Sequence, residues 1–198
     1  MKLLFVADPL DTFKTYKDST FAMMREAASR GHELWACEPQ QLVWRRGSLV
    51  QEQALIALSS MDAVLMRKDP PFDAEYIYAT HLLTQAEREG AHVFNKPQAL
   101  REHPEKLAIL EFPLHIAPTL VTRSIEAVRA FHAEHRDIIL KPLDGMGGTG
   151  IFRVGADGLN LGAIIETLNK DGAETVMVQR YLPAIKDGDK RILMIDGE

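Results

Sequence analysis

The sequence contains a single cysteine, Cys37, among its 198 residues. An internal disulfide is therefore impossible, and a reducing compartment fits this cysteine content. Cys37 lies within the strand-like run HELWACE, which favours a buried, unreactive thiol over a reactive one.

The sequence also lacks an excess of positive charge and any long apolar run. Its formal net charge of −5 argues against a nucleic-acid partner, because such binding depends on a basic surface that neutralises phosphates. The amino-terminal segment MKLLFVADPLD has too few consecutive apolar residues for a signal-peptide core or a membrane span. We expect a cytoplasmic protein without a membrane partner.

Apolar segments suited to strands and helices alternate over the first part of the chain. The expected strands cover 2–8, 32–38, 61–67 and 92–97, and the expected helices cover 19–31 and 73–90. This alternation predicts a parallel, doubly wound α/β sheet, in a first domain that we place at residues 1–122. Ser19 is the expected cap of the first helix, and residues 39–60 show no clear pattern. Ligands of such sheets bind beyond the carboxyl ends of the strands, where Asp8, Arg67 and Asn95 fall.

Residues 123–198 show a different pattern, with closely spaced strands and short glycine turns. Helices are expected at 124–135 and 160–170, and strands at 137–143, 151–154, 176–182 and 190–196. This arrangement is typical of an antiparallel α+β unit. It predicts a second domain.

Lys141 ends an apolar run in IILKPLDGMGGTG (138–150) and is followed by Gly145, Met146, Gly147 and Gly148. A dinucleotide-binding loop would lead into a helix and a P-loop would place its lysine after the last glycine, but here the strand-like IFRV follows. Two strands joined by a glycine loop predict a flap whose amides close over phosphates. The alternative is a solvated strand-end lysine beside a mobile hairpin tip.

Two further segments carry groups suited to a nucleotide. VMVQRYLPAI (176–185) is an extended run ending at a proline, whose backbone edge suits an adenine ring. In KDGDKR (186–191), Asp189 suits ribose hydroxyls and Arg191 suits a phosphate or carboxylate. The alternative for this segment is a charged hairpin tip. Upstream, Lys106 is expected on a helix, where a lysine is usually only solvated.

Taken together, NKPQALREHPEK, IILKPLDGMGGTGIFRV and VMVQRYLPAIKDGDKR resemble the ATP-grasp ligases. DSTFAM (18–23) and LMRKDPPFDAEYIYAT (65–80) are similar to the bacterial glutathione synthetases among them. The resemblance covers essentially the whole chain. It implies a Rossmann-like pre-ATP-grasp, substrate-binding domain followed by an α+β ATP-grasp domain that is incomplete at its carboxyl end.

The resemblance also implies an activity, the ATP-dependent joining of γ-glutamylcysteine to glycine through an acyl phosphate. The flap would protect that intermediate from water. Carried over by position, Arg191 would face the transferring group or the substrate. Asp18, Ser19 and Arg67 would bind the peptide substrate, although Asp18 and Ser19 also suit a simple helix cap and Arg67 an ion pair with Asp69 or Asp73. The ATP-binding residues would be Lys106, Lys141, Gly145, Met146, Gly147, Gly148, Gln179, Arg180, Tyr181, Leu182 and Asp189.

The family's reaction requires Mg²⁺ or Mn²⁺ held by oxygen ligands, and we expect these ligands beyond residue 198. The chain is therefore interpreted as an incomplete piece that is inactive alone, taken from a homo-oligomer. Two alternatives stay open. One is another carboxylate–amine ligase of this fold, and the other is a non-catalytic nucleotide-binding module that ends at Glu198.

Overall fold

The computed structural model describes residues 1–45, 48–51, 56–190 and 192. These residues form two compact units, 1–108 and 109–198, each of which is described by itself. None of the described helices combines the length and the apolar character that a bilayer crossing requires.

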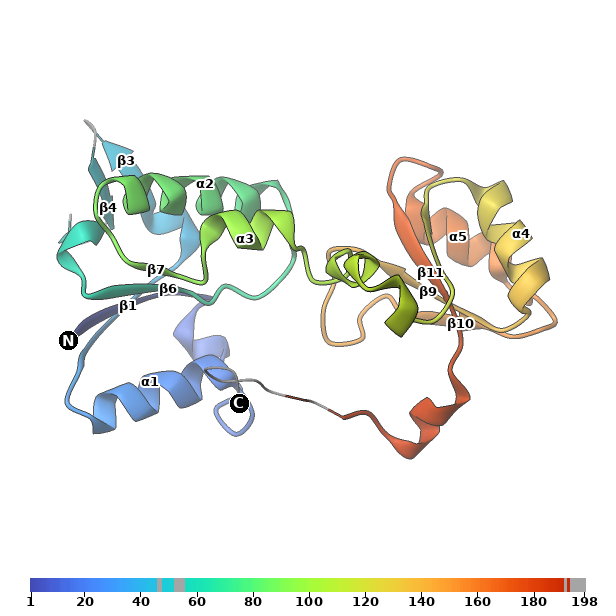
Figure 1. Cartoon of the computed structure of the whole chain (residues 1–198), viewed down its shortest axis with the longest axis horizontal. Coiled ribbons are helices and arrows are strands. Elements are labelled where there is room, and N and C mark those ends of the chain that lie inside the picture. The colour runs from blue at the N-terminus through green and yellow to red at the C-terminus, as the bar shows by residue number, and fades with distance from the viewer. Residues whose placement is uncertain (46–47, 52–55, 191, 193–198) are drawn as a thin grey trace. The chain divides into compact units, whose positions relative to one another are not determined.

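The first unit is built on a four-stranded parallel sheet with the order β2-β1-β6-β7. The strands are β1 (Lys2–Val6), β2 (Glu33–Cys37), β6 (Ala63–Met66) and β7 (Val93–Phe94). Helix α1 (Ser19–Ser29) covers one face, whereas α2 (Ala74–Arg88) and α3 (Pro97–Glu102) lie on the other (Figure 1). The doubly wound architecture predicted from the alternating pattern is confirmed.

Both faces of the sheet are buried, which explains the continuous apolar run in β1. Leu4 and Val6 pack in the core that includes Leu83 of α2, whereas Leu3 and Phe5 pack on the side of α1. Strands buried on both faces are expected to be uniformly apolar. Helix α1 begins after Asp18, whose Oδ1 accepts a hydrogen bond from the Phe21 N–H at 2.9 Å. The expectation that Ser19 caps this helix is therefore wrong, because Ser19 is its first helical residue.

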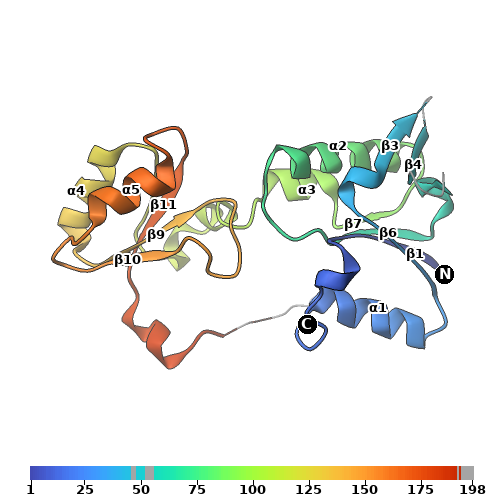
Figure 2. The same cartoon turned by 180° about the vertical axis from the view of Figure 1, so that it is seen from behind.

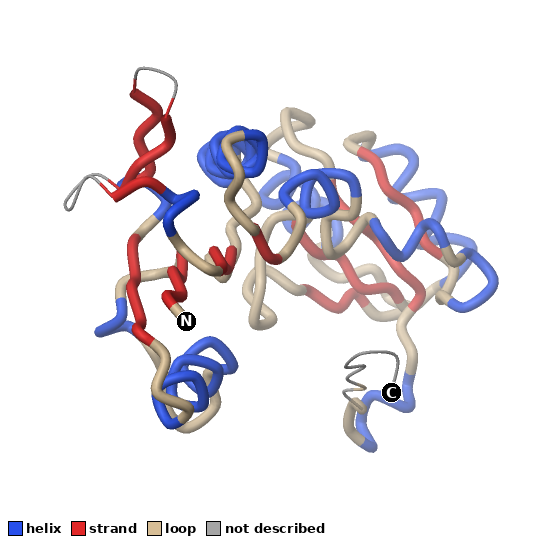
Figure 3. Tube along the Cα trace, turned by 60° about the vertical axis from the view of Figure 1, so that its left-hand side comes forward, coloured by secondary structure: helices blue, strands red, loops and turns tan. Residues whose placement is uncertain are grey.

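The patternless stretch forms a second, three-stranded antiparallel sheet of β3 (Leu42–Arg45), β4 (Ser48–Gln51) and β5 (Ile56–Ala57). Figure 3 shows the β3–β4 hairpin extending away from the parallel sheet. Short 3₁₀ helices connect the larger elements, at Leu10–Thr12, Pro39–Gln41, Leu58–Ser60, Ala108–Glu111, Pro113–His115 and Pro183–Asp187.

Lys106 lies in a turn between α3 and the 3₁₀ helix that begins at Ala108, so its expected placement on a helix is wrong. The reason is Pro104, which has no N–H to continue a helix and disfavours helical geometry in the residue before it. His103 accordingly has a φ of −122° and a ψ of 62°.

The second unit contains an antiparallel sheet with the order β10-β9-β11-β8. Its elements are β8 (Thr119–Thr122), α4 (Ile125–His135), β9 (Ile138–Pro142), β10 (Phe152–Val154), α5 (Leu161–Asn169) and β11 (Val176–Arg180). Helices α4 and α5 pack on one face (Figure 2). The unit begins earlier than the boundary expected after residue 122, because β8 pairs with β11. The expected strand at 190–196 lies outside the described residues, apart from Lys190 and Ile192.

Cys37 is buried at the end of β2, and this burial raises the pKa of its thiol to about 12. At pH 8 the folded protein therefore contains very little of the reactive thiolate. We expect iodoacetamide to label Cys37 more than about tenfold more slowly in the native protein than in 6 M guanidinium, as measured by mass spectrometry. Equal rates in the two states would contradict the buried placement.

Candidate functional site

Lys141 and Gln179 lie on the same face of the second sheet, opposite α4 and α5. On β9, Ile138 and Leu140 belong to the core formed with these helices. Side chains alternate along a strand, so Ile139 and Lys141 occupy the other face. The register of β11 places Met177 beside Lys141 and Gln179 beside Ile139. This face therefore carries one cation and one amide side chain on the two central strands.

The loop after Lys141 joins β9 to β10, as the sequence predicted, and its glycines are of two kinds. A Cβ at Gly145 or Gly150 would approach the Pro142 ring to 3.3 or 3.2 Å. Glycine therefore suits these two positions because Pro142 leaves little room for a side chain. Gly147 and Gly148 have φ values of +62° and +83° and open space around the position of a Cβ. Only glycine adopts such a backbone readily. The tip is closed by turn hydrogen bonds, from the Thr149 N–H to the Met146 carbonyl at 3.1 Å and from the Ile151 N–H to the Gly148 carbonyl at 3.3 Å.

Backbone donors at the end of β11 are mostly engaged. The Arg180 N–H donates to the Pro118 carbonyl at 3.0 Å, and the Tyr181 N–H donates to the Asp137 carbonyl at 2.9 Å. The Gln179 side chain donates to the Thr119 hydroxyl at 2.8 Å. Leu182 follows directly, and its N–H has no acceptor among the residues that the structure describes. It is the donor in this segment that a ligand can use.

Arg153, which the sequence analysis did not single out, fixes the end of β11. Its guanidinium donates to both oxygens of Asp137, at 3.0 and 2.7 Å, and stacks on the Tyr181 ring at 3.7 Å from the centroid. The hydrogen bonds from Arg153 lower the pKa of Asp137. The alternation in IFRV was the available signal, since it places Arg153 opposite Ile139 on the face that carries Lys141. Asp189 is exposed, and Arg191 lies outside the described residues.

In the first unit, Arg67 follows β6 at the carboxyl edge of the parallel sheet. Its Nε donates to the Thr20 hydroxyl at 3.1 Å and its Nη2 donates to the Ser19 hydroxyl at 3.0 Å. Arg67 forms no ion pair with Asp69 or Asp73 within the described parts of the chain, so that alternative is wrong. Asp73 instead caps α2 through the Tyr76 N–H.

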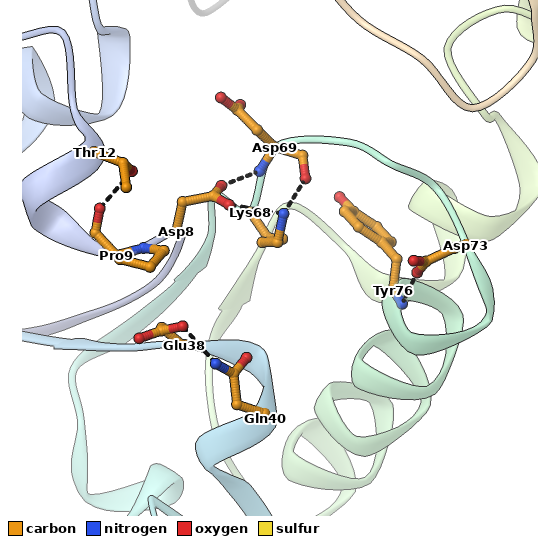
Figure 4. Close-up of polar contacts among 9 residues, drawn as sticks. All are labelled: Asp8, Pro9, Thr12, Glu38, Gln40, Lys68, Asp69, Asp73 and Tyr76. Atoms are coloured by element: carbon orange, nitrogen blue, oxygen red, sulfur yellow. Dashed lines mark hydrogen bonds and ion pairs between the residues drawn. The ribbon is translucent and has the colours of Figure 1, made fainter.

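Asp8 holds the loop that follows Arg67 (Figure 4). Its Oδ2 accepts from the Asp69 N–H and its Oδ1 pairs with Lys68 Nζ, both at 2.8 Å. Lys68 Nζ also donates to the Asp69 carbonyl at 2.6 Å. Burial, followed by the nearby Asp8 and Asp18 carboxylates, raises the pKa of Asp69. The locality therefore combines the Arg67 cation with several carboxylates.

A cavity of about 390 Å³ lies beside this loop. Lys68, Tyr76 and Tyr78 line it together with apolar side chains from β3 and α2, including Leu42 and Leu82. Partial burial raises the pKa of Tyr76, whose ring packs against Phe72 at 4.9 Å between centroids. No sequence pattern indicated this cavity, because its β3 side comes from residues 39–60, which show no clear pattern.

Sequence comparisons identify relatives along the whole chain. The family model of the prokaryotic glutathione synthetase N-terminal domain matches residues 1–101, and that of the prokaryotic glutathione synthetase ATP-grasp domain matches residues 105–198. Glutathione synthetase of Ralstonia nicotianae is 57% identical, and that of Nitrosomonas europaea is 52% identical. These alignments cover 100% of this chain and 66% and 68% of the respective relatives. The chain thus spans about two thirds of the length of these relatives.

Solved structures with the same fold are more distant in sequence. D-cycloserine synthetase DcsG superposes with a TM-score of 0.66 at 16% identity, covering 92% of this chain and 60% of that chain. A RimK domain ATP-grasp protein from Sphaerobacter thermophilus gives a TM-score of 0.63 at 24% identity, covering 92% and 65%. These likenesses establish the ATP-grasp fold. With both family models matching in succession, the chain belongs to the prokaryotic glutathione synthetase family.

Proposed function

We propose that the protein to which this chain belongs joins γ-glutamylcysteine to glycine at the expense of ATP. The observation that carries this proposal is the succession of two glutathione synthetase family models along the chain. In the proposed reaction, a carboxylate oxygen of γ-glutamylcysteine attacks the γ-phosphorus and ADP leaves. The amine of glycine then attacks the acyl carbon, and phosphate leaves as the amine loses a proton.

The second unit supplies the groups proposed for ATP. Lys141 would neutralise phosphate charge, and the amides at Gly145, Met146, Gly147 and Gly148 would close over the phosphates. The Leu182 N–H suits a ring nitrogen of adenine, since its neighbours already donate within the protein. Gln179, Arg180 and Tyr181 would line the same pocket, and Asp189 would accept from the ribose. Phosphate contacts by Lys106 and a catalytic role for Arg191 remain predictions.

The first unit supplies the groups proposed for γ-glutamylcysteine. Arg67 is held by neutral hydroxyls and forms no direct ion pair with a carboxylate among the residues that the structure describes. A carboxylate of the substrate would provide the missing countercharge. Ser19 would act by holding Arg67, and Asp18 would act through the carboxylate oxygen that does not cap α1.

The divalent cation is a separate expectation. In the described parts of the chain, no group of three or more His, Cys, Asp or Glu side chains is arranged to hold a metal ion. We derive no step through a Mg²⁺ or Mn²⁺ ion. A cytoplasmic location and a homo-oligomeric assembly also belong to this proposal.

The test of the proposed function is a coupled phosphate-release assay on the full-length gene product. We expect turnover with γ-glutamylcysteine and glycine together, and little without either of them. Mass spectrometry should identify glutathione as the product. Turnover only with a different acid and amine would assign the protein to another carboxylate–amine ligation. ATP binding without turnover on any such pair would favour a non-catalytic module.

Gly148→Ala tests the tip of the flap. At a φ of +83° a Cβ meets no atom within 4 Å, so the substitution acts through backbone strain of about 1 kcal/mol rather than through a clash. We expect a five- to tenfold loss of kcat/KM for ATP and a fall of only a few degrees in the unfolding midpoint, the shift that about 1 kcal/mol of strain produces. Gly155→Ala is the matched control, because Gly155 has an ordinary φ and its Cβ would make a normal contact of 3.6 Å. Equal effects of the two variants would contradict the assigned role.

A further inference from the structure

Thr20 is a buried residue of α1 that lies within the DSTFAM segment and has no role in the proposed mechanism. It is 4% exposed, and its hydroxyl accepts a hydrogen bond from Arg67 Nε at 3.1 Å. The two residues are separated by 47 positions in the sequence. Thr20 therefore connects the first turn of α1 with the carboxyl end of β6.

The hydrogen bonds of Arg67 occupy one particular edge of its guanidinium. Nε and Nη2 point to the same side of the planar group and donate to Thr20 and Ser19. A guanidinium has five N–H donors in a fixed fork, so the edge formed by Nη1 and Nη2 keeps its donors. No acceptor for Nη1 is present among the described residues.

The partners of Arg67 are also electrically neutral. A carboxylate in the position of Thr20 would orient the guanidinium equally well, but it would cancel the charge that attracts an anion. Hydroxyls fix the orientation of the group without a direct ion pair, and Asp69 interacts with its charge only through a Coulombic effect. The backbone of Arg67 is anchored as well, because its N–H donates to the Val6 carbonyl at 2.8 Å and continues the β1–β6 pairing.

We propose that Thr20 is a positioning residue for substrate recognition. Together with Ser19 it clamps the inner edge of Arg67, so that the outer edge presents two parallel donors to a carboxylate of the acceptor substrate. Thr20 does not contact the substrate. The inference rests on the proposed function for the identity of the ligand. It adds the residues that orient the Arg67 guanidinium toward that ligand.

Equilibrium binding of γ-glutamylcysteine to the full-length protein tests this inference without turnover. Thr20→Val keeps the side-chain shape and removes the hydroxyl, and we expect it to raise the Kd for γ-glutamylcysteine about tenfold by calorimetry. Thr20→Ser, which restores the hydroxyl, should bind within about twofold of wild type. In steady-state assays, Thr20→Val should raise KM for γ-glutamylcysteine while leaving kcat and KM for ATP nearly unchanged.

A matched control separates positioning from folding. Thr80 is fully buried in α2, and its hydroxyl accepts from Arg101 Nη1 at 3.0 Å. Thr80→Val therefore deletes a comparable Thr–Arg hydrogen bond away from the end of β6, and it should leave the Kd unchanged. If Thr20 acts through Arg67, Thr20→Val should not weaken γ-glutamylcysteine binding any further in a protein that already carries Arg67→Met.

The outcomes distinguish the inference from the proposed function. If Thr20→Val binds γ-glutamylcysteine as tightly as wild type, or if Thr20→Ser fails to restore binding, the positioning role is overturned while the ligase assignment stands. If wild type binds γ-glutamylcysteine with the expected variant pattern but forms no glutathione, the ligase assignment fails and the positioning role stands. If wild type does not bind γ-glutamylcysteine, the inference is overturned.

Discussion

Replacing Lys141 by methionine is expected to weaken ATP binding about 100-fold. A lysine about 4 Å from a phosphate oxygen contributes about 4 kcal/mol of Coulomb energy at an effective dielectric near 20. Desolvation removes part of this, and about 2–3 kcal/mol is typical of a hydrogen bond to a charged group. Each 1.4 kcal/mol changes the dissociation constant about tenfold. Methionine retains the apolar part of the side chain next to Met177 on the neighbouring strand, so the fold should persist.

Calorimetric titration with ATP measures this effect, and circular dichroism checks the fold. Lys170→Met is the control, because Lys170 belongs to the same unit and forms an exposed ion pair with Glu174, four residues further along the chain. Such pairs contribute little, and ATP affinity should not change. A Lys141→Met protein that binds ATP as tightly as wild type would show that Lys141 does not meet the phosphates.

Replacing Arg67 by methionine is expected to raise the Kd for γ-glutamylcysteine about 100-fold without changing ATP affinity. The variant removes a charge-assisted, two-pronged interaction with the substrate carboxylate, which is among the strong polar contacts in proteins. Arg67→Lys should recover only part of the affinity, because an ammonium lacks the planar fork. Calorimetry with each substrate separately gives both dissociation constants.

Arg101→Met is the control for Arg67. Arg101 also donates to threonine hydroxyls, those of Thr80 and Thr84. These hydrogen bonds connect α3 with α2, whereas those of Arg67 connect the end of β6 with α1. It should affect stability and not substrate affinity. If Arg67→Met and Arg101→Met were to change the Kd for γ-glutamylcysteine alike, a specific contact from Arg67 would be excluded.

Much of the fold follows from local sequence patterns. Ser124 caps α4 by accepting from the Ala127 N–H, and Gly31 follows the end of α1 with a φ of +75°, as helix-end preferences predict. Apolar runs located the central strands because those strands are buried on one or both faces. The β3–β5 sheet escaped prediction because the sequence of β3, LVWR, does not alternate between apolar and polar residues. Trp44 of β3, for example, is exposed, and its indole N–H donates a hydrogen bond to the Glu89 carboxylate instead of the ring packing in the core.

The charged residues of the candidate site could be predicted from the sequence, but the residues that they contact could not. Lys141 and Arg67 were recognisable because each ends an apolar strand next to a distinctive loop. The partners of Arg67 come from a helix far away in the sequence, and hydroxyl residues at the start of a helix ordinarily indicate only capping. Tyr181 was expected to line the adenine pocket, but its stacking with Arg153 could not be predicted. This contact requires that β9 pair with β10, which carries Arg153, and with β11, which Tyr181 follows.

The strand order β10-β9-β11-β8 has a consequence for how the sheet face that carries Lys141 and Gln179 responds to local opening. Lys141 and Gln179 are on the two inner strands, each of which is hydrogen-bonded on both sides. Inner strands open only with larger parts of a structure, whereas outer strands fray locally. Amide protons of β9 and β11 should therefore exchange with deuterium last. Local opening of β10 leaves both side chains in place, whereas opening of β8 removes the Thr119 hydroxyl to which Gln179 donates.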